Sequence, residues 1–166
     1  MLIASQAIPV FAIAPLLVLW LGYGLGSKIA MAMLIIYFPV TANFYDGLRH
    51  TPRGWLDLAR VMLPEPRRWA VLRHIALPAA LPALGSGLRV AAAVAPIGAV
   101  LGEWVGSSAG LGYLMLHANS RMQVDLLFAA LLVLAALAVG LYFAVDAGLK
   151  RWLPWHPPNP ETVETD

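Results

Sequence analysis

The feature that most constrains this chain is an uncharged run of twenty residues, LLFAALLVLAALAVGLYFAV, from Leu126 to Val145. About 20 apolar residues in a helix cross the hydrocarbon core of a bilayer. Backbone polar groups in lipid must be hydrogen-bonded within the protein, so a span of this kind is expected to be helical. The whole chain is 60% hydrophobic and only 12% charged, whereas soluble domains carry about 25% charged residues. The sequence therefore predicts an integral membrane protein and excludes an ordinary soluble domain.

Three further apolar blocks precede this run, at about residues 8–25, 29–44 and 79–101. None shows the alternation of apolar and polar residues that is typical of strands. The first block is short and holds Pro9 and Pro15 in its first half. We expect an all-α fold with about four transmembrane helices.

The third block combines small residues with one charge. The small residues would let neighbouring helices approach closely, either for simple packing or to line a kinked pathway; they are Gly85, Gly87, Ala91 and Gly98. A charge inside such a block is costly. Arg89 is therefore expected to face the bundle interior, water or a partner, or to snorkel toward the cytoplasm.

The basic residues predict how the chain is oriented. Six of the eleven Lys and Arg residues lie between the second and third blocks: Arg49, Arg53, Arg60, Arg67, Arg68 and Arg73. Lys150 and Arg151 follow the fourth block, whereas the loops after the first and third hold only Lys28 and Arg121. Because basic residues favour the cytoplasmic side of a membrane, we expect the start of the chain, the middle loop and the C-terminus to be cytoplasmic.

The middle loop, about residues 49–77, is too long to be a plain connection. Apolar residues recur in it at helical spacing, first at Trp55, Leu58 and Met62 and then at Trp69, Leu72 and Ile75. Pro66 suits the first turn of the second helix. Leu77-Pro78 is expected to close that helix, because a residue before proline disfavours the helical region.

Three interpretations of the two short helices compete. They could lie on anionic lipid headgroups, where each basic residue contributes roughly 1 kcal/mol. They could instead dock on a cytoplasmic protein. Nucleic-acid binding is disfavoured, because the basic residues are tied to the membrane.

Residues 103–121, EWVGSSAGLGYLMLHANSR, form a Gly- and Ser-rich segment on the expected periplasmic side. It is a poor transmembrane helix, and irregular backbone at membrane depth is tolerated only inside protein or along a cavity. The segment is either an outer gate or binding-protein dock, or an ordinary periplasmic turn with an interfacial helix. Its polar groups are Glu103, Ser107, Ser108, Tyr113, His117 and Asn119.

Covalent and metal chemistry find little support in the sequence. The chain has no cysteine, and its four histidines share no metal-ligand spacing. It has two lysines and no phosphate-binding Gly-x-x-x-x-Gly-Lys-Ser/Thr motif. We expect no cofactor on this chain. Residues 1–155 are expected to form one transmembrane domain, and the proline-rich tail at 156–166 is expected to be disordered.

The stretch DLARVM…RRWAVLRHIALPAALPALGSGLRVAA resembles the cytoplasmic-loop signature of ABC importer permeases. That signature reads Glu-Ala-Ala, three residues, Gly, nine residues, Ile-x-Leu-Pro. Asp57, Leu58 and Ala59 stand at its start, and Ile75, Leu77 and Pro78 match its close. Leu63 stands in place of the glycine, and the following turn is two residues longer than the pattern.

Other stretches resemble the same family, namely Ser5–Ile29, Asp46–Arg49, Ile97–Met115 and Ala118–Leu134. Within the family they are most similar to the branch for sulfonates, taurine, nitrate and thiamine pyrimidine precursors, and within that branch to hydroxymethylpyrimidine permeases. Such permeases typically have about two more transmembrane helices before the segment that begins at Ser5. On this basis we expect the chain to be a fragment, a mis-started gene product or a shortened subunit.

The resemblance implies the fold of a type I ABC importer permease core, placed as a multi-pass protein in the bacterial inner membrane. The implied partners are a dimeric ATPase that binds ATP-Mg, a periplasmic or lipid-anchored substrate-binding protein, and a second permease copy in a homodimer. The implied ATPase-coupling residues are Trp55, Asp57, Leu58, Ala59, Arg60, Met62, Arg67, Arg68, Trp69, Leu72, Arg73, Ile75, Leu77 and Pro78. The expected pathway or gate residues are Arg89, Glu103, Ser107, Ser108 and Asn119. A secondary transporter and a non-transporting membrane scaffold are the alternatives of another class.

Overall fold

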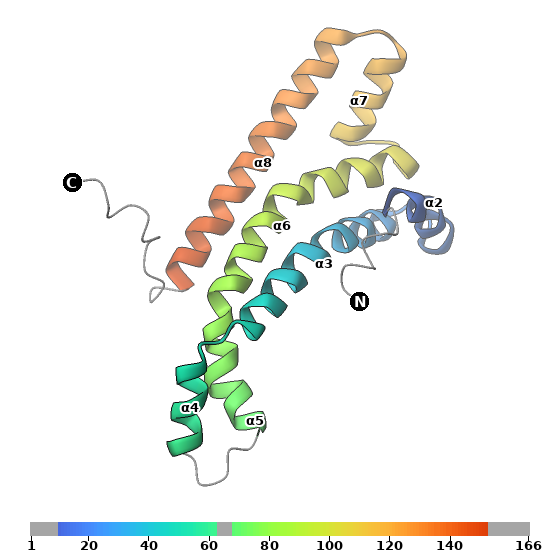
Figure 1. The fold of residues 1–166 in the computed structure, drawn as a ribbon. Helices are drawn as coiled ribbons and strands as arrows, with labels where there is room; N and C mark the ends of the chain where they lie inside the picture. Colours follow the sequence, from blue (N-terminus) through green and yellow to red (C-terminus); the bar gives the residue numbers. More distant parts are fainter. Residues whose placement is uncertain (1–9, 63–67, 153–166) are drawn as a thin grey trace, which may run out of the picture.

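The computed structural model describes residues 10–62 and 68–152, which are helical apart from short connections (Figure 1). The elements are α2 (Val10–Leu21), α3 (Leu25–Arg49), α4 (Arg53–Met62), α5 (Arg68–Val71), the π-helical turn η1 (Leu72–Ala76), α6 (Leu77–Gly106), α7 (Leu111–Ser120) and α8 (Val124–Trp152). No strand occurs in these two ranges. The expected all-α class is confirmed. The predicted tail at 156–166 lies outside the described residues.

In the part of the chain that the structure describes, three helical segments are long and apolar enough to cross a membrane: Leu25–Arg49, Trp69–Gly106 and Val124–Trp152. The sequence predicts that the first apolar block forms a fourth membrane-spanning helix, and the helix found there is shorter. Within the described residues it forms α2, whose 12 residues extend only about 18 Å. Gly22, at φ 78°, ends that helix before α3 begins.

The helices are arranged around α6. It packs along α3 on one side and against α8 on the other, as Figure 1 shows. α4 and α5 project at one end of the molecule, beyond the last turns of α3 and α8. α7 and the first turn of α8 lie at the opposite end, where α7 contacts both α6 and α8.

Small residues explain the close approach of α3 and α6. A Cβ atom added at Gly87 would lie 2.9 Å from the carbonyl oxygen of Pro39, and one added at Gly98 would lie 2.9 Å from Cα of Ala32. Real Cβ atoms are not found this close to backbone, so glycine is required where the helices touch. Small residues at helix contacts are typical of membrane proteins. The structure thus supports the packing interpretation of Gly87 and Gly98.

Substituting Gly98 by alanine is expected to lower the free energy of unfolding by about 1–3 kcal/mol, because the backbone of α3 would have to move to admit the methyl group. Gly140→Ala on α8 is the matched control. Nothing lies within 4 Å of the Cβ that it adds, so it should be neutral or stabilising by up to about 1 kcal/mol. Denaturant titration of the purified protein in detergent measures both values. Equal stability of the two variants would contradict the tight contact.

The prediction that Leu77-Pro78 ends the cytoplasmic helix is wrong. Leu77 is helical, at φ −64° and ψ −51°, and its N–H donates to the carbonyl of Leu72, five residues earlier. Proline lacks an N–H and crowds the carbonyl four residues before it. A π-helical turn changes the hydrogen-bonding register, so the helix continues past Pro78 instead of stopping. The helix from Trp69 to Gly106 is therefore continuous from the middle loop into the candidate membrane span.

Candidate functional site

The two short helices of the middle loop form what we call the coupling segment, residues 53–62 and 68–78. It lies at one end of the molecule, past the span of α3 (Figure 1). Apolar side chains on it are exposed: Trp55 by 54%, Leu58 by 58% and Trp69 by 69%. Exposed apolar groups of this size are available for contact with a partner or with lipid.

The coupling segment contains nearly all the residues that the sequence assigns to ATPase coupling. α4 carries Trp55, Asp57, Leu58, Ala59, Arg60 and Met62, and the second part carries Arg68, Trp69, Leu72, Arg73, Ile75, Leu77 and Pro78. Arg73 is exposed and Ile75 is half-buried. Arg67, Leu63 and Pro66, with the predicted longer turn, lie outside the described residues.

The coupling segment follows α3 in the chain and leads into α6. On the α3 side, His50 caps the helix, because its backbone N–H donates to the carbonyl of Asp46 over 2.9 Å. The buried Thr51 donates from Oγ1 to the carbonyl of Leu48 over 2.9 Å. On the other side, η1 continues directly into α6. A displacement of residues 68–76 would therefore act directly on α6.

The start of α6 and the end of α3 are also in direct contact. A Cβ added at Gly47 would lie 2.5 Å from Cβ of Ala83 and 3.3 Å from Cα of Ala80. Ala80 is fully buried. The base of the coupling segment is thus a tightly packed junction of two helices.

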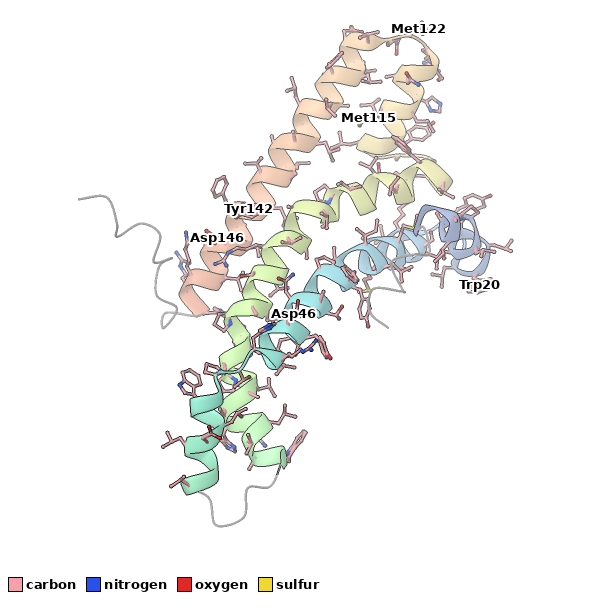
Figure 2. All side chains as sticks on the ribbon, in the orientation of Figure 1. Trp20, Asp46, Met115, Met122, Tyr142 and Asp146 are labelled. Atoms are coloured by element: carbon pink, nitrogen blue, oxygen red, sulfur yellow. The ribbon has the colours of Figure 1, made fainter. Side chains whose placement is uncertain are left out.

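An ion pair connects α6 to α8. Arg89 Nε lies 2.7 Å from Asp146 Oδ1, and Lys150 Nζ lies 2.8 Å from Asp146 Oδ2. Asp146 lies near the end of α8, on the same side of the molecule as the coupling segment (Figure 2). The structure therefore gives Arg89 a partner, and it shows Asp146 as a paired charge.

Apart from Arg89, the expected gate residues lie at or beyond the other end of α6, where Glu103 and Ser107 are close in the chain and each bind another helix. Glu103 Oε2 accepts hydrogen bonds from the backbone N–H groups of Gly112 and Tyr113, over 2.6 and 3.3 Å. Ser107 accepts from Lys28 Nζ over 2.7 Å. We call the group around Glu103 and Ser107 the outer cluster.

Ser108 and Asn119 are not joined to the outer cluster by any hydrogen bond of the described residues. Ser108 is exposed and lines a shallow pocket with Tyr23, Trp104 and Ser107. Asn119 lies in the last turn of α7 and lines a separate pocket at the turn into α8. Of the five expected gate residues, Glu103, Ser107 and Ser108 thus lie near one another, whereas Arg89 and Asn119 lie elsewhere.

Some contacts of these sites were missed by reasoning from the sequence. Lys28 was taken only as a loop charge, yet it reaches Ser107, 79 residues away. Trp104 donates from Nε1 to the carbonyl of Gly112 over 3.0 Å. The pattern Gly-Leu-Gly at 110–112 was a usable signal, because such glycines favour a close backbone approach. Within the described residues no group of three His, Cys, Asp or Glu could hold a metal ion.

Comparison with known proteins gives a consistent result. The family model described as "binding-protein-dependent transport system inner membrane component" matches residues 1–153. A "probable ABC transporter permease protein" of Haemophilus influenzae is 66% identical over 92% of this chain and 61% of its own length. The formylaminopyrimidine transport permease protein ThiX of Halalkalibacterium halodurans is 38% identical over 93% of this chain and 61% of its own. The riboflavin transport system permease protein RibX of Chloroflexus aurantiacus is 43% identical over 92% of this chain and 55% of its own length.

The chain thus spans about three fifths of the length of the curated relatives it matches. No solved structure matches it. The relatives are named as permease proteins and not as enzymes, and the three membrane-length helices fit an integral membrane protein. With a family match over nearly its full length, the chain belongs to the inner membrane components of binding-protein-dependent transport systems, the permeases of ABC transporters.

Proposed function

We propose that this chain is part of the translocation pathway of an ATP-driven ABC importer for a small solute, and that ATP-Mg is bound and hydrolysed on a separate ATPase dimer. The observation that carries this proposal is the coupling segment. The exposed Trp55, Leu58 and Trp69 lie on α4 and α5, which project beyond the end of α3 (Figure 1), and the segment continues directly into α6 through η1. An element of this kind can transmit the movement of a docked partner into the membrane.

The proposed orientation places the coupling segment and the end of α8 on the cytoplasmic side of the bacterial inner membrane. Arg49, Arg73, Lys150 and Arg151 all belong to the end of the molecule from which the coupling segment projects. Basic residues favour the cytoplasmic face. The outer cluster would then face the periplasm, where a soluble or lipid-anchored substrate-binding protein would deliver the solute.

The remaining proposed partners are a second permease copy, forming a homodimer, and membrane lipid. Large apolar side chains on α8 are exposed along the helix, for example Leu132, Val139 and Phe143. Such a surface is stable only against lipid or another apolar protein surface. Both occupants are compatible with this face of α8.

For the solute we propose a pyrimidine, with hydroxymethylpyrimidine or a related thiamine precursor as the best candidate. Two relatives are named for formylaminopyrimidine and riboflavin, and both compounds contain a pyrimidine ring. Sulfonates, taurine and nitrate remain the alternative solutes, from the resemblance of the sequence to that branch.

The test is uptake into proteoliposomes that contain this chain, co-expressed with its ATPase and supplied with its binding protein. We expect labelled hydroxymethylpyrimidine to accumulate only when ATP is present in the compartment that the ATPase faces. Unlabelled formylaminopyrimidine should compete for this uptake, and taurine should not. Competition by taurine and not by formylaminopyrimidine would overturn the proposal that the solute is a pyrimidine. Uptake that survives without ATP but collapses with the proton gradient would indicate a secondary transporter, and no uptake with any ATPase would indicate a scaffold.

A further inference from the structure

The first turn of α7 is capped by a side chain from another helix. The first N–H groups of a helix have no partner within it, and Gly110, which precedes α7, offers no side chain to cap them. Glu103, near the end of α6, supplies the cap through its hydrogen bonds from Gly112 and Tyr113. A carboxylate at this position is also favoured by the helix dipole.

The backbone of the turn is shaped around this carboxylate. Gly110 has φ 125°, a conformation that other residues rarely adopt, and a Cβ there would collide with the carboxylate of Glu103. A Cβ at Gly112 would lie 2.9 Å from Glu103 Oε2 and 3.0 Å from Cα of Val100. The two glycines therefore allow α7 to begin directly against the carboxylate.

Neighbouring residues hold the same place from other directions. Trp104 donates to the carbonyl of Gly112, and Glu103 accepts from the N–H of Tyr113, which belongs to the same peptide unit. Two consecutive residues of α6 therefore bind both polar groups of this peptide unit of α7. Lys28 on α3 donates to Ser107 in the turn. The contacts come from α3 and α6, the two helices that also carry the coupling segment.

We propose that Glu103 is a positioning residue that fixes α7 to α6, so that α7 moves with the outer end of α6 as one body during transport. This inference rests on the proposed function, because it concerns how movement reaches the outer side. α6 is continuous with the coupling segment through η1, and Glu103 extends that connection to α7. A displacement at the cytoplasmic end is then delivered to the outer cluster without an independent hinge at residues 107–110.

The direct test is a distance between α6 and α7 in different states. The chain has no cysteine, so spin labels can be placed on it at two introduced cysteines, Ala99→Cys on α6 and Leu116→Cys on α7, both of which are exposed positions. In the assembled transporter, with labelled chain diluted by unlabelled chain so that the distance within one copy is measured, we expect one narrow distance distribution that is the same with and without ATP trapped on the ATPase. A distance that changes between the two states would overturn the proposal, whatever the variants below do.

Glu103→Ala and Glu103→Gln provide the second readout. We expect alanine to broaden the distance distribution and to lower the solute taken up per ATP hydrolysed at least tenfold, while the basal ATPase rate stays within about twofold. Glutamine should be intermediate, because its amide oxygen still accepts a hydrogen bond but carries no charge. The matched control is Ser120→Ala, since Ser120 donates only within α7, to the carbonyl of His117; it should leave both readouts unchanged.

The two proposals fail in different ways. If Glu103→Ala does not fold, Glu103→Gln and the wild-type distance still decide the positioning role. If Glu103→Ala and Glu103→Gln keep a narrow distance distribution and wild-type uptake per ATP, the positioning role is overturned and the proposed function stays intact. Absence of ATP-dependent uptake in the wild type would overturn the proposed function, and the distance between α6 and α7 would still be measured.

Discussion

Replacing Trp69 and Leu72 together by glutamate is expected to abolish both the association of this chain with its ATPase partner and solute uptake. Trp69 is 69% exposed, so its side chain contributes little to the folded core, and Leu72 is 37% exposed. At an interface, apolar anchors of this kind are each worth about 2 kcal/mol or more. Losing two of them lowers affinity by roughly a thousandfold. Co-purification with the tagged ATPase and ATP-dependent uptake measure the two effects.

The design needs a control for charge on an exposed apolar surface. Met122→Glu serves, because Met122 is 83% exposed but lies in the turn between α7 and α8, at the far end of the molecule (Figure 2). It should leave ATPase binding unchanged. If the double variant co-purifies with the ATPase at the wild-type ratio, the coupling segment is not the docking site. If the double variant keeps its binding to the ATPase and loses only its binding to anionic vesicles, the segment lies on lipid headgroups instead.

The membrane helices were predictable because their cause is local. The charge-free run at 126–145 lies within α8, and the block at 79–101 lies within α6. Apolar length alone decides that such a segment is helical in lipid. The amphipathic pattern of the coupling segment was visible for the same reason, since spacing along one helix is a property of the sequence.

Features that depend on how helices are placed in space were not predictable in the same way. Arg89 and Asp146 are 57 residues apart, and nothing in either neighbourhood indicates the pairing. The break after α2 and the continuation of α6 past Pro78 depend on local backbone geometry that the residue types permit but do not require. For the outer cluster, the residues were identified but not their roles, because a Gly-rich segment fits both an irregular turn and the short helix α7.

The pairing of Arg89 with Asp146 gives the other large effect that we expect. Arg89→Asp would place two carboxylates side by side, and Asp146→Arg would place three cations together, since Lys150 also contacts Asp146. The side chains of Arg89 and Asp146 are only 30% and 16% exposed, so water can relieve little of either repulsion. Each single reversal is expected to separate α8 from α6 and to abolish uptake, with loss of monodisperse protein in detergent.

The double reversal, Arg89→Asp with Asp146→Arg, distinguishes pairing from a requirement for particular residues. It restores opposite charges at the same two positions, and we expect it to recover most of the monodisperse protein and at least a tenth of wild-type uptake. Lys150→Ala is the control, because the side chain of Lys150 is 71% exposed and exposed pairs contribute little to stability. A double reversal no better than either single one would mean that Arg89 acts through something other than Asp146. Rescue would instead show that the contact between α6 and α8 is required, at the end of α6 opposite to the Glu103 contact.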